Sequence, residues 1–182
     1  MKNTKFKAIA IPAVTLTLIC IIVAGLLGTV NAVTVDKIAQ LEAEKLAESQ
    51  MLVLPDAQSF EEVQEGAYCG KDASGQTVGY VMVTSRQGYG GEVKTVVGID
   101  NEGVITGVTV TADDETPGLG ARSTGENFRS QFNGITINDI VGVSKDKNGG
   151  TIDALSGATI TSRAVCGAVS DAIELYKTVK GA

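Results

Sequence analysis

The chain opens with a long stretch in which no residue is charged. Residues 8–35 are uncharged, and the apolar run at 9–30 has the length that a helix of ~20 residues needs to cross the hydrocarbon layer of a membrane. Pro12 falls in the first turn of such a helix, where its missing N–H costs little. The pattern predicts a short N-terminal segment at 1–8 and one transmembrane helix at 9–32.

Charges on the two sides of this run predict its orientation. Lys2, Lys5 and Lys7 precede it and Asp36 follows it, so the positive-inside rule places the N-terminus in the cytoplasm and everything after residue 35 outside. A cleaved signal peptide is the alternative, with small residues at 30–32 as a cleavage site. A secretory apolar region is about 7–15 residues long, and this run is longer. We therefore favour a retained anchor in the cell membrane, and both interpretations export the rest of the chain.

Beyond the anchor, two kinds of hydrophobic pattern alternate. Residues 33–54 are rich in Ala, Glu, Lys and Leu and predict a juxtamembrane helix or linker that ends at Pro55. Residues 55–182 then form the exported domain. Short β-branched and aromatic runs predict strands at 79–84, 94–99 and 104–111.

Turn sequences indicate how these strands pair. The stretch at 72–75 pairs the first strand back with 67–69, and the glycine-containing link at 100–103 joins the other two as an antiparallel hairpin. A short helix is expected at 123–132, and the apolar stripe of the last segment predicts a C-terminal helix, the stripe being Val165, Val169, Ala172, Ile173 and Tyr176. The fold class expected is α+β, with antiparallel hairpins packed against helices after one transmembrane helix.

The amino-acid composition excludes several classes of function. The chain has no histidine, and its 15 basic against 21 acidic residues give a net charge of −6, which disfavours nucleic-acid binding. No catalytic triad with histidine and no metal motif is present, so redox chemistry would need an organic cofactor. Cys69 and Cys166 are expected to be small buried residues rather than a disulfide.

Three glycine-bearing stretches stand out as candidate chemistry, at 88–91, 115–120 and 156–161. In the second, Pro117 and Gly118 fit the central positions of a type II turn, and a loop of this kind lets backbone approach a flat ligand. The third opens the C-terminal helix, where free N–H groups suit a phosphate. Four hydroxyls crowd this helix start, and Ser156 is expected to cap the helix. Thr161 should face away from Thr159, whereas Ser162 returns to its side.

These stretches resemble the motifs of the FMN-binding domain family. In that family a flavin transferase links FMN through its phosphate to the threonine after Gly-Ala, which here is Thr159. The resemblance implies a flavin pocket formed by Tyr89, Gly90, Glu115, Thr116, Pro117, Gly118, Leu119, Gly120, Ser156, Gly157 and Ala158, with no metal and no catalytic side chain.

The order of anchor, the residues 54–57 and these motifs resembles the G-subunit family of Rnf complexes, relatives of the C subunit of the sodium-translocating NADH:quinone reductase. This implies an electron-transfer subunit of an ion-translocating ferredoxin:NAD oxidoreductase in the membrane, with other Rnf subunits and a flavin transferase as partners. Two alternatives remain: an exported covalent flavoprotein of another electron-transfer chain, and a membrane-anchored binding module without redox function.

The charge asymmetry around the anchor makes a testable prediction. A protease added outside spheroplasts should degrade the domain after Asp36 while the membrane is intact, because that domain lies outside. The measurement is the loss of full-length chain on an immunoblot, with a cytoplasmic protein as the control. Protection of the domain until the membrane is opened would show that the orientation is reversed.

Overall fold

The computed structural model describes residues 2–146 and 149–181 of the chain, with side chains from Ala10 onward in the first helix. It divides into two compact units, Met1–Leu46 and Ala47–Ala182. The second unit thus begins before residue 55, because the last turns of the first helix pack with the sheet. We describe each unit by itself.

A single helix, α1 (Lys2–Val53), spans both of the helical segments expected at 9–32 and 33–54. They are continuous because the Ala, Glu, Lys and Leu residues that follow the apolar run are strong helix formers. In the first unit, the large apolar side chains from Ile11 to Leu41 are exposed. Among the described residues, α1 is the one helix long and apolar enough to cross a membrane, as the sequence pattern predicted.

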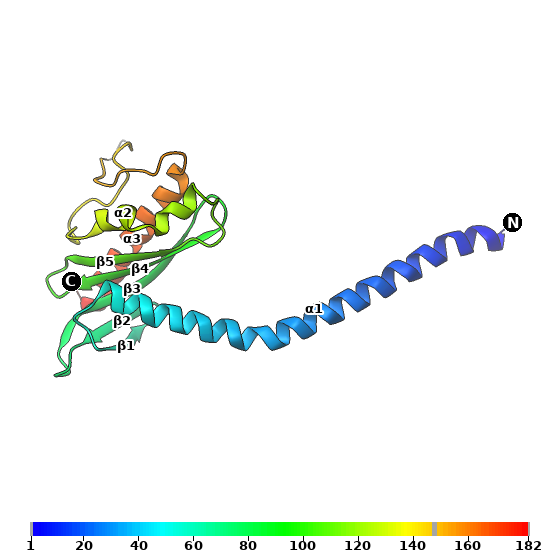
Figure 1. Cartoon of the computed structure of the whole chain (residues 1–182), viewed down its shortest axis with the longest axis horizontal. Helices are drawn as coiled ribbons and strands as arrows, with labels where there is room; N and C mark the ends of the chain where they lie inside the picture. The colour runs from blue at the N-terminus through cyan, green and yellow to red at the C-terminus, as the bar shows by residue number, and fades with distance from the viewer. Residues whose placement is uncertain (1, 147–148, 182) are drawn as a thin grey trace. The chain divides into compact units, whose positions relative to one another are not determined.

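The second unit is built on a five-stranded antiparallel sheet whose strands follow one another in sequence order (Figure 1). Its strands are β1 (Ser59–Gln64), β2 (Ala67–Lys71), β3 (Thr77–Gln87), β4 (Glu92–Asp100) and β5 (Ile105–Thr111). The three expected strands and both hairpins are confirmed. Sequence analysis missed β1, most of whose residues are exposed, so it lacks the apolar alternation of a half-buried strand.

One short helix was expected at 123–132, and this prediction is wrong. The segment forms three short pieces, η1 (Gly120–Thr124), α2 (Glu126–Arg129) and η2 (Ser130–Phe132). Gly125 breaks the run because its backbone is extended, with φ −75° and ψ 146°. The rings of Phe128 and Phe132 still meet edge to face, with centroids 5.7 Å apart, and both are buried in the core.

The C-terminal helix α3 (Thr159–Lys180) packs across β3 and β4. All five residues of its predicted apolar stripe are buried. Two hydrogen bonds set its position on the sheet: the Thr84 hydroxyl donates to the Ala168 carbonyl at 2.8 Å, and the Tyr176 hydroxyl donates to the Asp100 carbonyl at 3.0 Å. The helix ends at Gly181, whose φ of 70° few other residues adopt.

Both cysteines of this unit are buried free thiols, as expected. Burial raises the pKa of the Cys166 thiol to about 12. A thiol that stays protonated at physiological pH is a poor nucleophile, so Cys166 acts as a packing residue.

The end of α1 packs against glycines of the sheet. Val53 and Leu54 are buried, and the Thr106 hydroxyl donates a hydrogen bond to the Val53 carbonyl. A Cβ atom on Gly98 would lie 2.2 Å from the Val53 carbonyl oxygen, and one on Gly107 would lie 3.0 Å from the Val53 Cα. The backbone of α1 therefore approaches the sheet to a distance that only glycine permits.

Replacing Gly98 with alanine should therefore destabilise the domain. The added methyl would collide with backbone that cannot move aside, and overpacking of this kind costs about 1–3 kcal/mol. The midpoint of thermal unfolding, followed by circular dichroism, measures the effect. Gly142→Ala is the matched control, because the nearest atom to its Cβ would be 3.7 Å away. Equal midpoints for the two variants would refute this account of the packing.

Candidate functional site

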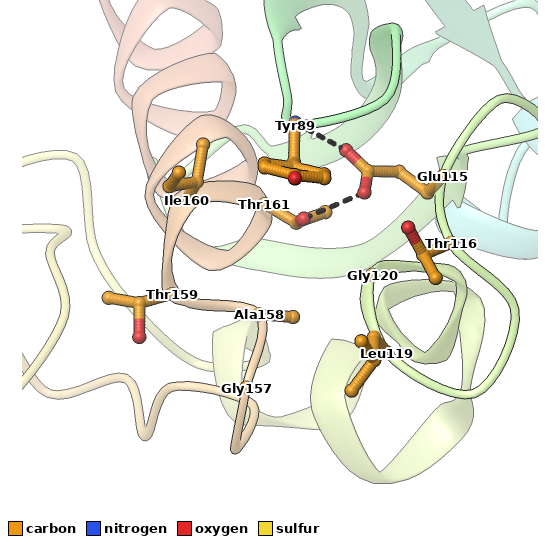
Figure 2. A pocket seen from close by; sticks show the side chains of 10 residues that line it. All are labelled: Tyr89, Glu115, Thr116, Leu119, Gly120, Gly157, Ala158, Thr159, Ile160 and Thr161. Atoms are coloured by element: carbon orange, nitrogen blue, oxygen red, sulfur yellow. Dashed lines mark hydrogen bonds between the residues drawn. The ribbon is translucent and has the colours of Figure 1, made fainter.

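An open pocket of about 560 Å³ lies at the N-terminal end of α3 (Figure 2). Its volume is in the range of small-molecule and cofactor sites, ~300–1,000 Å³. Three separate segments contribute its lining residues: Tyr89; Glu115, Thr116, Leu119 and Gly120; and Gly157, Ala158, Thr159, Ile160 and Thr161. The three glycine-bearing stretches of the sequence thus meet at one place.

The side chain that joins these segments is Glu115, which is only 4% exposed. Its Oε1 accepts hydrogen bonds from the Tyr89 N–H at 2.7 Å and the Gly90 N–H at 3.3 Å. Its Oε2 accepts one from the Thr161 hydroxyl at 3.0 Å (Figure 2). One buried carboxylate therefore connects the β3–β4 turn, its own loop and the first turn of α3.

The glycines around Glu115 make room for this arrangement. A Cβ on Gly88 would lie 2.2 Å from Oε1, and a Cβ on Gly120 would lie 2.1 Å from Oε2. A Cβ on Gly90 would come within 2.1 Å of the Asp114 carbonyl oxygen. From the sequence, the glycines of the loop at 115–120 were expected to allow the close approach of a ligand. In the structure they allow the three segments to approach one another.

The loop at 115–120 has the expected turn. The Leu119 N–H donates to the Thr116 carbonyl at 3.1 Å, and Gly118 has a φ of +78°, as the second central position of a type II turn requires. Leu119 contacts the third segment, because a Cβ on Gly157 would be 3.0 Å from its Cδ2. The loop therefore borders the pocket and supports the start of α3.

The start of α3 differs from expectation in its cap. Ser156 was expected to cap the helix, and this is wrong: the N-cap position is Ala158, with no side-chain cap. Ser162 stabilises the start instead. Its Oγ accepts a hydrogen bond from the Leu155 N–H at 3.0 Å and donates one to the Ala158 carbonyl at 2.9 Å. The two hydrogen bonds of the buried Ser162 side chain thus stabilise the start of the helix.

The clustered hydroxyls now fall into two groups. Thr161 and Ser162 are buried, at 1% and 0% exposure, and both make the hydrogen bonds described above. Thr159 is half-buried and lines the pocket, and its hydroxyl has no hydrogen bond with the described part of the chain. Ser156 is exposed and does not line the pocket. Of these four side chains, only Thr159 therefore presents an accessible hydroxyl to the pocket.

Most of the residues expected at the site line the pocket, but some do not. The expected residues that do not line the pocket are Gly90, Pro117, Gly118 and Ser156. Sequence analysis missed Ile160 and placed Thr161 away from the site. The position of Thr161 was readable, since it lies four residues before Val165 on the buried stripe of α3.

The pocket carries few charges. Glu115 is the one charged residue among its lining side chains. Arg163, the nearest base along α3, is paired with Asp146 at 2.6 Å, and its hydrogen bonds lower the pKa of that aspartate. Within residues 2–146 and 149–181, no group of three or more His, Cys, Asp and Glu side chains could hold a metal ion.

Two family models match the chain. Residues 88–174 match the model of the FMN-binding domain, and residues 1–50 match that of the RnfG N-terminal region. The domain resembles the crystal structure of the C subunit of Na(+)-translocating NADH-quinone reductase from Parabacteroides distasonis, with a TM-score of 0.54 and 25% identity over 64% of this chain and 62% of that one. A long apolar helix followed by an FMN-binding domain defines the class of protein.

Relatives along the whole chain define the family. The chain is 36% identical to the G subunit of the ion-translocating oxidoreductase complex of Methanosarcina acetivorans, over 96% of this chain and 98% of the relative. It is 34% identical to the G subunit of the Na(+)-translocating ferredoxin:NAD(+) oxidoreductase complex of Acetobacterium woodii, over 90% of this chain and 89% of the relative. The chain belongs to the G-subunit family of ion-translocating oxidoreductase complexes.

The contacts of Glu115 predict a large loss of stability for one substitution and a small loss for another. Glu115→Ala leaves two backbone N–H groups and a buried hydroxyl without their acceptor, which should cost on the order of 3 kcal/mol and lower the unfolding midpoint by about 5–10 °C. Glu115→Gln retains an oxygen for the N–H groups and offers its amide to Thr161, so it should lose far less.

Thermal unfolding of the full chain in detergent measures this difference. Glu92→Ala, at an exposed site at the start of β4, is the control for removal of a glutamate side chain. If Glu115→Ala unfolds at the same temperature as Glu92→Ala, Glu115 does not hold the three segments together.

Proposed function

We propose that this chain relays electrons through one FMN, covalently linked by its phosphate to the Thr159 hydroxyl. It would do so as the G subunit of a membrane-bound, ion-translocating ferredoxin:NAD oxidoreductase, together with the other Rnf subunits. The observation that carries the proposal is the position of Thr159. Of the four hydroxyls clustered at the start of α3, it is the accessible one that lines the pocket, on the first residue of that helix.

The start of α3 suits a phosphate. The first N–H groups of a helix have no partner within the helix, and the helix dipole places partial positive charge there. Ser162 and Thr161 direct their hydroxyls inward, so they leave the outer side of this turn to Thr159. A phosphoester on Thr159 would therefore lie where the helix end stabilises its negative charge.

The rest of the pocket suits a flat, largely apolar ring. Tyr89 is 71% exposed, Ile160 is 52% exposed, and Leu119 is exposed beside them. One of these comes from each of the three segments, and all line the pocket (Figure 2). Large apolar side chains this exposed are suited to stacking and packing against a bound ring. The bound FMN would supply the electron-carrying group, and these side chains would orient it.

Attachment of the flavin needs a second protein. The chain has no histidine to deprotonate a threonine, and the carboxylate at the pocket, Glu115, already accepts three hydrogen bonds. A flavin transferase would therefore form the bond. Since the exported domain follows α1, this would occur outside the cytoplasm, with the N-terminus inside and α1 anchored in the bilayer.

Replacing Thr159 with alanine should abolish the covalent flavin and leave the fold intact, because its hydroxyl supports no other described residue. The full chain is expressed with a flavin transferase, and the band is viewed under ultraviolet light on a denaturing gel. Thr178→Ala, on the same helix, is the matched control and should keep the full label. The same chain expressed in a host without the transferase is the negative control and should show no fluorescent band.

Peptide mass mapping identifies the attachment site directly. An FMN adduct on the peptide that contains Thr159 is expected, and fragmentation places it on that residue. A label that persists in Thr159→Ala, or an adduct on Ser162 or Thr161, would show that the assignment is wrong.

A further inference from the structure

The pocket has an unusual electrostatic composition for a site that binds an electron carrier. Within the described part of the chain, Glu115 is its one charged lining residue, and it is buried. Two backbone N–H groups and a hydroxyl donate to it, and it lies at the first turn of α3, where a negative charge is favourable. The carboxylate is therefore satisfied by hydrogen-bond donors, and burial leaves the field of its charge weakly screened.

Among the residues that the structure describes, no basic side chain forms an ion pair with this carboxylate. Asp113 and Asp114 precede it on the same loop, and the Asp114 carboxylate lies against the β3–β4 turn, 2.8 Å from the Cβ position of Gly91. On η1, Arg122 is exposed to water. On α3, Arg163 is exposed and paired with Asp146. The positive end of α3 would face the phosphate on Thr159, which brings its own negative charge.

We propose that Glu115 tunes the flavin: its buried negative charge lowers the reduction potential of a flavin in this pocket and keeps the reduced ring in its neutral, protonated form. The inference rests on the proposed function. Reduction adds two electrons to the ring, and a like charge beside it disfavours any negative charge that they leave. Beside Glu115, a bound ring would therefore be expected to gain two protons with the two electrons, whereas in an uncharged pocket it could lose one of them.

Glu115→Gln separates this effect from the structural role of the residue. The glutamine oxygen can accept from the Tyr89 and Gly90 N–H groups, and its amide can donate to the Thr161 hydroxyl. The substitution removes the charge and keeps the links between the three segments. Glu92→Gln is the matched control, because it removes the same charge from an exposed side chain near the same turn, where water screens it.

The experiment is a reductive titration of the flavinylated full chain in detergent. Dithionite is the electron donor and reference dyes report the potential. At about pH 8.5, the ratio of reduced to oxidised flavin at a fixed potential should rise at least tenfold in Glu115→Gln, a positive shift of about 30 mV for a two-electron couple. Glu92→Gln should match the unmodified chain to within about threefold, or ~15 mV.

The pH dependence of the potential provides a second readout that needs no variant. Two protons per two electrons give a slope of about 59 mV per pH unit, and one proton gives about 30 mV. The unmodified chain should keep the steeper slope from about pH 6 to about pH 8.5, since the like charge of Glu115 raises the pKa of the reduced ring. In Glu115→Gln the slope should fall toward the shallower value within this range.

The results of these titrations distinguish failure of the inference from failure of the proposed function. A flavin-bearing Glu115→Gln chain whose potential is unchanged or lower would overturn the inference, and its fluorescent band would leave the proposed function intact. A one-proton slope at neutral pH in the unmodified chain would overturn the inference even if Glu115→Gln fails to fold or to take up flavin. If the unmodified chain takes up no flavin in the presence of the transferase, the proposed function fails, and the inference fails with it.

Discussion

The pocket depends on one buried carboxylate. Glu115 accepts hydrogen bonds from the β3–β4 turn and from Thr161 on α3, segments that lie 26 and 46 positions away along the chain. A buried charge is tolerated only when several donors satisfy it, so these segments must close around it together. The glycines follow from this constraint, because Gly88 and Gly120 leave the space that the two carboxylate oxygens occupy.

The helix α3 serves both the core and the site. Its apolar stripe is buried against the sheet, and the hydrogen bond from Thr84 to Ala168 sets its position along β3. With that face fixed, the helical period decides which hydroxyls point inward. Thr161 reaches Glu115 and Ser162 reaches back to Ala158, while Thr159 remains at the pocket. The packing of the core therefore leaves Thr159 as the accessible hydroxyl among those at the start of α3.

Much of the fold was predictable because its signals are local. The apolar anchor, the strands of the two hairpins and the stripe of α3 all follow from periodicity and turn chemistry. The break at Gly125 and the strand β1 were missed, since glycine does not always interrupt a helix and β1 has no buried face to give it a pattern. The identity of the cap was also missed, because Ser162 satisfies the helix start from four residues downstream of Ala158.

The site itself was only partly readable. The three glycine stretches were recognised, but the contacts that require glycine there were not. Contacts between residues as distant along the chain as Gly88 and Glu115 cannot be predicted from the local sequence pattern. Charge preference also differs within the pocket, between the side chains of Thr159 and Glu115 (Figure 2). The end formed by the first turn of α3 offers unpaired N–H groups and positive dipole charge, which suit a phosphate. The wall at Glu115 presents a buried negative charge, which opposes further negative charge. A ligand with an anionic group at one end and a neutral ring at the other matches this polarity. The same asymmetry would orient such a ligand with its phosphate toward Thr159.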